Sequence, residues 1–362
     1  MTPDPRTADT LPRRVLAELT TGSDWLGSWW PTAVLAVLAL ALVAVAARPP
    51  RRDGQVRHRW PAAVAALCSL LLAAALAVNT VVGYVPNVSA AWLLLSGQRV
   101  AAHAGSGQVS PLTIPIPATV LMPTSTTWVY TPPGYDPAGS MRYPVVYLIH
   151  GTPGQSSDWV TGGDIGHVMD VLIAEHLVRP MIVVAPDVNG TGQDDTECLN
   201  STRGGSQVET YLSAVVVPWV DKNYSTLADW PHRVIGGMSS GGFCALDQGL
   251  RHQELYGSII ALEPYGDPGS GGRAMLATPA ELDAHSPAHY LPTLTFAHPV
   301  PTFLDVGGLA GADVQTAPLT AQLRARGQVV LARVEPDQEH NWTMARLGIP
   351  HGLVFVSAQM PR

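Results

Sequence analysis

Two long apolar runs near the N-terminus restrict this chain more than any other feature. Residues 31–47 and 60–82 contain no charged side chain, and their hydrophobic residues cover every face of a helix. At about 1.5 Å per residue, the second run is long enough to cross a bilayer core of about 30 Å. Trp29 and Trp30 can extend the first run into the interface. We therefore predict two transmembrane helices within residues 31–83, preceded by an N-terminal tail, residues 1–30.

Two alternatives remain for these runs. A cleaved signal peptide has one apolar core near its start, whereas here the first run begins after thirty residues and a second follows. A buried helical hairpin in a soluble protein is the other alternative. The composition favours a membrane segment, because only 14% of the residues are charged and the mean hydropathy is +0.15.

Arginines indicate how the spans are oriented. The loop between the runs holds five of them: Arg48, Arg51, Arg52, Arg57 and Arg59. Beyond the second run, Arg99 is the only one nearby, while three in the N-terminal tail weaken the asymmetry without reversing it. The positive-inside rule places the loop in the cytoplasm. We therefore expect a multi-pass protein of the cell membrane with an extracytoplasmic C-terminal domain.

The remainder of the chain divides into a linker and one domain. Residues 84–110 hold an apolar stretch, 90–95, which we interpret as an interfacial or packing element, and a Gly/Ser-rich segment. From residue 111 to 362, β-rich runs alternate with helical stretches, which predicts a mainly parallel sheet with helices on both faces, entered by antiparallel strands at about 112–131. The expected strands are 127–131, 145–149, 181–185, 234–236, 258–262, 302–306 and 329–334, and the expected helices are 165–178, 207–223, 241–252 and 314–326.

The segment Gly237-Met238-Ser239-Ser240-Gly241 carries the strongest chemical signal. It matches G-x-S-x-G and lies between an expected strand and an expected helix. Such a turn presents a serine nucleophile and needs glycines where a Cβ would clash with close backbone. We predict Ser239 as the nucleophile and the backbone N–H of Ser240 as an oxyanion donor. A Gly/Ser-rich surface loop is the alternative, and Ser240 is the rival nucleophile.

A second oxyanion donor is expected after the strand 145–149, which runs into His150-Gly151-Thr152. In the α/β-hydrolase fold this loop supplies a backbone N–H. Thr152 can donate one, whereas Pro153 has none. His150 is a possible catalytic base, but we interpret it as a structural residue that fixes the loop.

Serine needs a base, and the order of this fold places the histidine after the last strand. His340 follows strand 329–334, and we predict it as the general base; His351 is the nearest rival, and a capping role for His340 is the structural alternative. The acid is expected after the penultimate strand, where Asp313 is our choice and Asp305 the alternative. Two further carboxylates remain open for the same role: Glu335 and Asp337.

The other charged groups and the cysteines restrict the function classes. Cys198 and Cys244 are predicted to form a disulfide, the alternative being two buried thiols, and Cys68 lies in a span. No C-x-x-C pair is present, which argues against a zinc ribbon. The net charge of −7, with no cluster of basic residues in the second half of the chain, argues against a nucleic-acid partner. The expected chemistry requires no metal and no organic cofactor.

Several segments of the domain together resemble the bacterial esterase family, which includes S-formylglutathione hydrolases (esterase D) and mycolyltransferases. The segments are LIHGTPGQSSDW, VVAPDVNGTGQDDTEC, VETYLSAVVVPWVD, VIGGMSSGGFCAL and EHNW, within residues 112–350. The resemblance implies an α/β-hydrolase fold, a Ser239 nucleophile and a His340 base followed by Trp342. It also implies that Glu209 organises the active-site side of the sheet. Many members have Ser-Gly where this chain has Glu263-Pro264-Tyr265, so the substrate does not carry over.

The function that these features favour is serine esterase activity on lipid or cell-envelope esters. An acyltransferase that moves the acyl group to a sugar hydroxyl is one alternative, and a non-catalytic binding module on a hydrolase fold is another. The sequence does not indicate the acyl chain, the acceptor or the oligomeric state.

Overall fold

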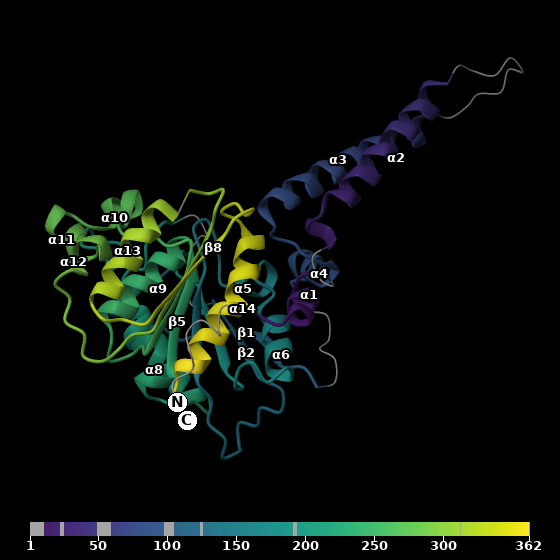
Figure 1. The fold of residues 1–362 in the computed structure, drawn as a ribbon. Coiled ribbons are helices and arrows are strands. Elements are labelled where there is room, and N and C mark those ends of the chain that lie inside the picture. The colour runs from purple at the N-terminus through teal and green to yellow at the C-terminus, as the bar shows by residue number, and fades with distance from the viewer. Residues whose placement is uncertain are drawn as a thin grey trace, which may run out of the picture.

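The computed structural model describes residues 11–21, 25–48, 59–97, 105–123, 126–190, 194–311 and 313–361. Its centre is an eight-stranded sheet in the order β1-β2-β4-β3-β5-β6-β7-β8 (Figure 1). The strands are β1 (Gln108–Thr113), β2 (Thr126–Thr131), β3 (Val145–Ile149), β4 (Ile182–Pro186), β5 (Arg233–Met238), β6 (Ser258–Leu262), β7 (Thr302–Gly307) and β8 (Val330–Glu335).

The sheet is parallel except at one edge. Strand β1 pairs antiparallel with β2, and β2 pairs antiparallel with β4, whereas all pairs from β4 to β8 are parallel. Parallel strands end at one edge of a sheet, and in this register Met238 of β5 lies opposite Leu262 of β6. The predicted fold class and the antiparallel entry strands are therefore confirmed.

Helices cover both faces of the sheet. Those of the hydrolase domain are α5 (Asp158–Thr161), α6 (Ile165–Ala174), α7 (Val208–Thr210), α8 (Val217–Asn223), α9 (Ser240–Arg251), α10 (Gly269–Met275), α11 (Pro279–Ala284), α12 (Pro287–Tyr290), α13 (Asp313–Ala325) and α14 (Trp342–Gln359). A π-helical segment, η3 (Tyr211–Val216), joins α7 to α8, and a 3₁₀ turn, η4 (Trp230–His232), precedes β5.

The strands feed two separate cores because their side chains alternate between the faces. Val146 and Leu148 pack on one side with α6 and α14, while Val145 and Tyr147 pack on the other with α8 and α9. Both faces are buried, which is why these strands are continuous apolar runs rather than alternating ones. The site therefore rests on a sheet that is fixed from both sides.

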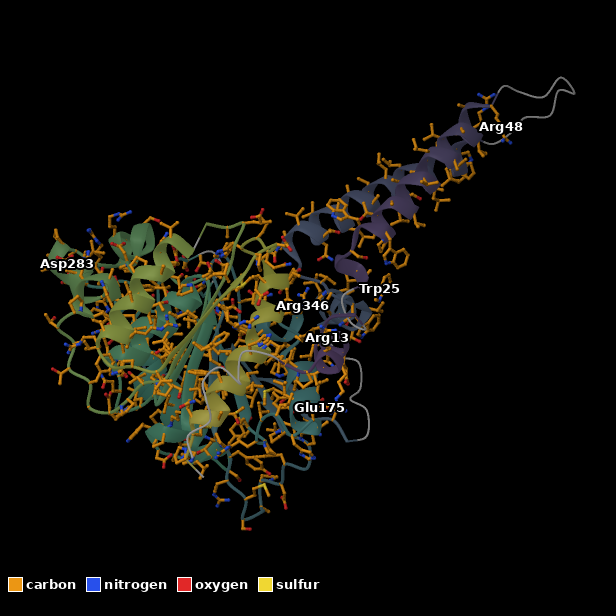
Figure 2. The ribbon with its side chains drawn as sticks, viewed as in Figure 1. Arg13, Trp25, Arg48, Glu175, Asp283 and Arg346 are labelled. Carbon is orange, nitrogen blue, oxygen red and sulfur yellow. A yellow bond between two sulfur atoms is a disulfide. The ribbon has the colours of Figure 1, made fainter. Side chains whose placement is uncertain are left out.

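The N-terminal part adds α1 (Arg13–Thr21), a 3₁₀ turn η2 (Trp25–Gly27), α2 (Trp29–Ala47), α3 (Trp60–Val82) and α4 (Val88–Ser96). Helices α2 and α3 pack on each other and project from the domain (Figure 1), and both are long and apolar enough to span a membrane. Arg48 lies at the end remote from the domain (Figure 2). Most of the expected basic loop, residues 49–58, lies outside the described residues.

Part of the expected tail packs against the domain. Leu11, Val15 and Leu19, on and just before α1, are buried in the core on the α6 side, and Arg14 pairs with Glu175. In the expected linker, Asn87 caps α4 by accepting a hydrogen bond from the backbone N–H of Ala90. Residues 98–104 of that linker lie outside the described part of the chain.

The end of α3 is attached to the start of α14. Arg346 is buried and donates to the carbonyl oxygens of Gly83 and Gly162, both at 2.5 Å. Asn341 Nδ2 donates to Val81 O at 3.0 Å, and Tyr84 Oη donates to Asp158 Oδ1 at 2.7 Å. Figure 2 labels Arg346 on this side of the domain. The apolar helices therefore join the domain beside the loop that carries His340.

Candidate active site

Ser239 lies in a strained turn between β5 and α9. Its backbone has φ 61° and ψ −123°, a conformation that residues other than glycine rarely adopt. A Cβ on Gly237 would lie 2.2 Å from Gly241 O, and one on Gly241 would lie 2.2 Å from Ile149 O. These two contacts show why glycines flank the serine. The turn holds the Ser239 hydroxyl at the carboxyl edge of the sheet.

The two residues predicted as oxyanion donors, Ser240 and Thr152, line the same cavity as Ser239. Ser240 is the first residue of α9, and its hydroxyl lies 3.0 Å from Thr152 Oγ1. Asn189 Nδ2 donates to Thr152 Oγ1 at 2.7 Å and to Gly151 O at 3.1 Å, which fixes the loop after β3. Among the described residues, the N–H groups of Ser240 and Thr152 donate to no other group. The assignment of these two N–H groups as oxyanion donors stays a prediction.

His150 has a structural environment. It is fully buried, and its Nε2 accepts a hydrogen bond from Val188 N at 3.1 Å. Since Nε2 is an acceptor, Nδ1 carries the proton and donates to Gly151 O at 2.9 Å. Both ring nitrogens are occupied in holding the loop after β3, which fits the structural interpretation.

His340 faces the carboxylate of Glu263, which was not among the acids proposed from the sequence. Its Nδ1 lies 3.5 Å from Glu263 Oε2, and the Glu263 side chain is fully buried whereas that of His340 is 44% exposed. Glu263 Oε1 accepts a hydrogen bond from Gly307 N at 2.6 Å. Glu263 also has a left-handed backbone, with φ 51°. Within the described residues, no hydrogen bond joins His340 to Ser239.

The position of Glu263 follows from the register of the sheet. Ser239 N donates to Leu262 O at 3.0 Å, so the residues that follow β5 and β6 are neighbours. Glu263 comes directly after β6, the strand next to the nucleophile strand β5. In the sequence, Glu263-Pro264-Tyr265 was apparent only as a departure from the Ser-Gly of many family members. The tertiary structure gives Glu263 a partner, His340.

Of the two acids proposed first from the sequence, the structure describes the side-chain surroundings of Asp305. Asp313 begins α13, and its side chain lies outside the described part of the structure. Asp305 is buried in β7, where its Oδ2 lies 3.5 Å from Arg333 Nε. Burial, and then the charge of Glu335, raise the pKa of Asp305 to about 8. Glu335 pairs with Arg333 at 2.6 Å, and Asp337 is exposed.

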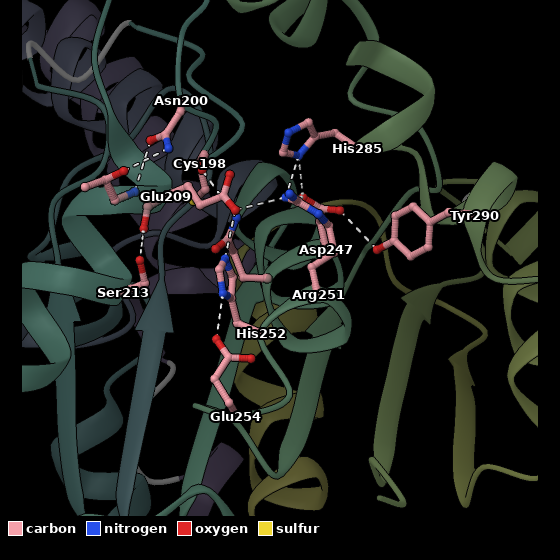
Figure 3. A network of polar contacts seen from close by, with 12 residues as sticks. Cys198, Asn200, Glu209, Ser213, Asp247, Arg251, His252, Glu254, His285 and Tyr290 are labelled. Carbon is pink, nitrogen blue, oxygen red and sulfur yellow. Dashed lines mark hydrogen bonds and ion pairs between the residues drawn. The ribbon is translucent and has the colours of Figure 1, made fainter. Parts of the chain in front are cut away.

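Glu209 lies in a network remote from Ser239. Its Oε1 accepts from His252 Nε2 at 2.8 Å and lies 3.1 Å from Arg251 Nη1 (Figure 3). Burial opposes ionisation, but the His252 hydrogen bond and the Arg251 charge lower the pKa of Glu209 overall. These partners are at the C-terminal end of α9, roughly 17 Å along the helix from Ser240, so the described contacts of Glu209 lie at the opposite end of α9 from the nucleophile.

A cavity of about 470 Å³ opens over the nucleophile. Its lining is Thr152, Asp195, Glu197, Ser239, Ser240, Tyr265, Asp267, Gly269, Ser270 and Gln315. The predicted disulfide between Cys198 and Cys244 is present and ties the Glu197 loop to α9. The carboxylates in this cavity were not predicted from the sequence, because only the fold brings residues 195–197 and 265–267 beside the Ser239 turn.

Comparison with known proteins agrees with this fold. Residues 121–348 match the model of the esterase family described as "Putative esterase". The chain therefore belongs to this bacterial esterase family of α/β-hydrolases.

Curated relatives match over part of their length. An uncharacterised protein of Corynebacterium glutamicum is 32% identical over 146 residues, 40% of this chain and 34% of that protein. An esterase of Mycobacterium tuberculosis is 31% identical over 142 residues, 39% of this chain and 29% of that protein. The chain thus spans about a third of the length of these relatives.

Solved structures share the fold. A ferulic acid esterase has a TM-score of 0.61 at 24% identity, with 71% of this chain and 99% of that chain covered. An S-formylglutathione hydrolase from Agrobacterium tumefaciens has a TM-score of 0.58 at 17% identity, with coverage of 72% and 98%.

Proposed function

We propose that this protein is a membrane-anchored serine esterase that cleaves carboxylic esters through an acyl-enzyme on Ser239. The observation that carries the proposal is the strained Ser239 turn in a cavity that Ser240 and Thr152 also line. We assign the backbone N–H groups of these two residues as the oxyanion donors. Each such donor contributes roughly 3 kcal/mol to stabilising an oxyanion in a well-studied protease. Family membership supports ester hydrolysis as the reaction.

In this mechanism His340 takes the Ser239 proton as the oxygen attacks the ester carbonyl. The imidazole becomes positively charged, and a carboxylate at Nδ1 stabilises it and holds its tautomer. We assign that role to Glu263, because it is the carboxylate that lies 3.5 Å from Nδ1. His340 then protonates the leaving alcohol, and water releases the acid from Ser239 by the reverse sequence. The His340 ring must move toward Ser239 when substrate binds.

The apolar helices support a substrate at the membrane surface. Val81 and Gly83, at the end of α3, contact Asn341 and Arg346, so the anchor joins the domain next to His340. An anchor at this place keeps the active-site edge close to the bilayer. We accordingly propose membrane lipids or envelope esters as the substrate class, with the domain on the side of the membrane opposite residues 49–58.

A fluorophosphonate probe tests the nucleophile in the full-length protein in detergent. We expect the wild type and Ser240→Ala to be labelled, since Ser240→Ala retains the backbone N–H, and Ser239→Ala not to be. If Ser239→Ala were labelled as strongly as the wild type, Ser239 would not be the nucleophile. Absence of labelling in folded wild-type protein would contradict the esterase proposal.

A further inference from the structure

The cavity over Ser239 is strongly acidic. Three carboxylates line it, Asp195, Glu197 and Asp267, and no lysine, arginine or histidine is among its described lining residues. Acidic residues on a surface are usually solvated, but these face the same cavity as a nucleophile and its oxyanion donors. Whatever ester Ser239 attacks must therefore lie against them.

Glu197 is fixed rather than free to turn away. It is 4% exposed, and both of its carboxylate oxygens lie 2.7 Å from Tyr265 Oη, which can donate to one of them. The Tyr265 ring stacks on Phe243 of α9 at 5.2 Å. The next residue, Cys198, is bonded to Cys244 on the same helix. The carboxylate is thus held in place by the helix that begins beside Ser239.

The negative charge in the cavity is incompletely compensated. Asp195 is half-buried and its carboxyl shares a hydrogen bond with Glu197, while its buried Oδ1 has no hydrogen-bond partner among the described residues. Burial, and then the neighbouring Asp195 charge, raise the pKa of Glu197 to about 8. A positive charge placed between these carboxylates would reverse both effects, because it would compensate Asp195 and favour the ionised form of Glu197.

Asp195 also borders a second, largely apolar cavity of about 420 Å³. Its lining is Leu121, Met122, Pro123, Asp194, Asp195, Thr196, Gly205, Ser206, Ala274 and Met275. The acidic group therefore lies between the nucleophile and a place for hydrocarbon. No set of three or more His, Cys, Asp or Glu in the described chain converges as a metal site requires, which favours an organic cation.

Resting on the proposed esterase function, we infer that Glu197 and Asp195 select esters that carry an ammonium group close to the scissile bond. The cation can belong to the acyl part, as in an aminoacyl ester, or to the alcohol part, as in a choline ester. Both share the chemistry that an acidic cavity recognises, and the experiment distinguishes them.

Matched pairs of esters test the inference with the full-length protein. Butyrylcholine is compared with 3,3-dimethylbutyl butyrate, its uncharged isostere, and p-nitrophenyl 6-aminohexanoate with p-nitrophenyl heptanoate. We expect kcat/KM to be about tenfold or more higher for the cationic member of one pair, since a desolvated carboxylate discriminates strongly between charged and neutral groups. That preference should fall to near unity in Glu197→Gln and weaken in Asp195→Asn.

The controls separate charge recognition from damage to the fold. Asp283→Asn removes a carboxylate on α11 that is 64% exposed and is not among the lining residues of the cavity, and it should keep the preference. Glu197→Gln retains an acceptor for Tyr265, and its preference is taken as the ratio of kcat/KM within each pair, so that any general loss of activity cancels. Equal kcat/KM within both pairs, or a preference that survives both substitutions, would overturn the inference.

Binding without turnover keeps the two proposals distinguishable. Calorimetric titration of Ser239→Ala with the preferred cationic ester should show binding that the added Glu197→Gln change abolishes. If wild-type Ser239 reacts with the fluorophosphonate and the neutral esters are cleaved but no cation preference exists, this inference alone fails. If Ser239 is unreactive, the esterase proposal fails, and the calorimetry still decides whether the cavity binds a cation.

Discussion

Ser239 and Glu263 occupy equivalent places, one residue beyond the ends of neighbouring strands β5 and β6. Both are non-glycine residues with positive φ, 61° and 51°. Such conformations cost about 1–3 kcal/mol each and persist where the surrounding structure holds them. Here the Gly307 N–H holds the Glu263 carboxylate and leaves its other oxygen facing His340.

At this scale we predict that Glu263→Gln lowers kcat/KM for a soluble ester by about a thousandfold, since the amide no longer stabilises a charged imidazole. Steady-state hydrolysis of a p-nitrophenyl ester measures this. Asp305→Asn and Asp313→Asn distinguish the acids, and we expect each to stay within about threefold of the wild type. A large loss in Asp313→Asn with an active Glu263→Gln would instead identify Asp313 as the acid.

At the scale of elements, α3 and α14 meet at Gly83 and Thr343. Gly83 ends α3 in a left-handed conformation with φ 69°, and a Cβ there would lie 2.3 Å from Thr343 Oγ1 and 2.7 Å from Thr343 N. Thr343 is only three residues beyond His340. Trp342, the residue before Thr343, packs on Trp159 with ring centroids 5.3 Å apart.

We therefore predict that Gly83→Ala lowers kcat/KM at least about tenfold, because the start of α14 must shift, and lowers Tm. Gly97→Ala is the matched control: Gly97 ends α4 with φ 67° but has nothing within 4 Å of its would-be Cβ. It should cost only the backbone strain of about 1–2 kcal/mol and leave kcat/KM unchanged. Equal losses of activity in the two variants would rule out coupling between α3 and the His340 loop.

At the scale of the whole molecule, Asp305 makes the free energy of unfolding depend on pH. Its pKa is raised from 3.8 to about 8 by burial and by Glu335. Between these values the folded chain keeps a proton that the unfolded chain has released, so stability is full below about pH 4 and falls as pH rises through 8. Glu197, with a pKa of about 8, acts in the same direction.

We predict that Asp305→Asn, which imitates the protonated form, becomes more stable relative to the wild type as pH rises from 5 to 8. The relative gain should be on the order of 2–4 kcal/mol, discounted for relaxation around the buried carboxylate. Thermal unfolding in detergent across this pH range measures the trend. The stability of Asp136→Asn, a change on an exposed loop, should vary with pH in the same way as that of the wild type. If the stability of Asp305→Asn varied with pH as that of the wild type does, the raised pKa of Asp305 would be contradicted.

Local pattern sufficed for much of the fold. Strand–helix alternation located β2 to β8 and the principal helices α6, α9 and α13 to within a few residues, because buried parallel strands and their crossover helices are recorded in local hydrophobic periodicity. Spacing also located the Ser239 turn, since the glycines that a strained turn requires are its immediate neighbours in the chain. The Cys198–Cys244 disulfide, between residues 46 apart, could be predicted for a different reason: both residues follow strands whose carboxyl ends lie at one edge of a parallel sheet.

Pairings between distant segments needed the tertiary structure. Glu263 comes beside His340 only through the order of β6, β7 and β8, and chain order alone pointed to Asp313. The acidic cavity brings residues 195–197 next to residues 265–267. The contact between the end of α3 and the start of α14 brings residues 81–84 next to residues 341–346. Amino-acid order by itself determined which elements form and where the nucleophile lies, since both depend on neighbours in the chain. The register of the sheet decided which charges meet over it, because contacts between strands carry no signature in any single segment.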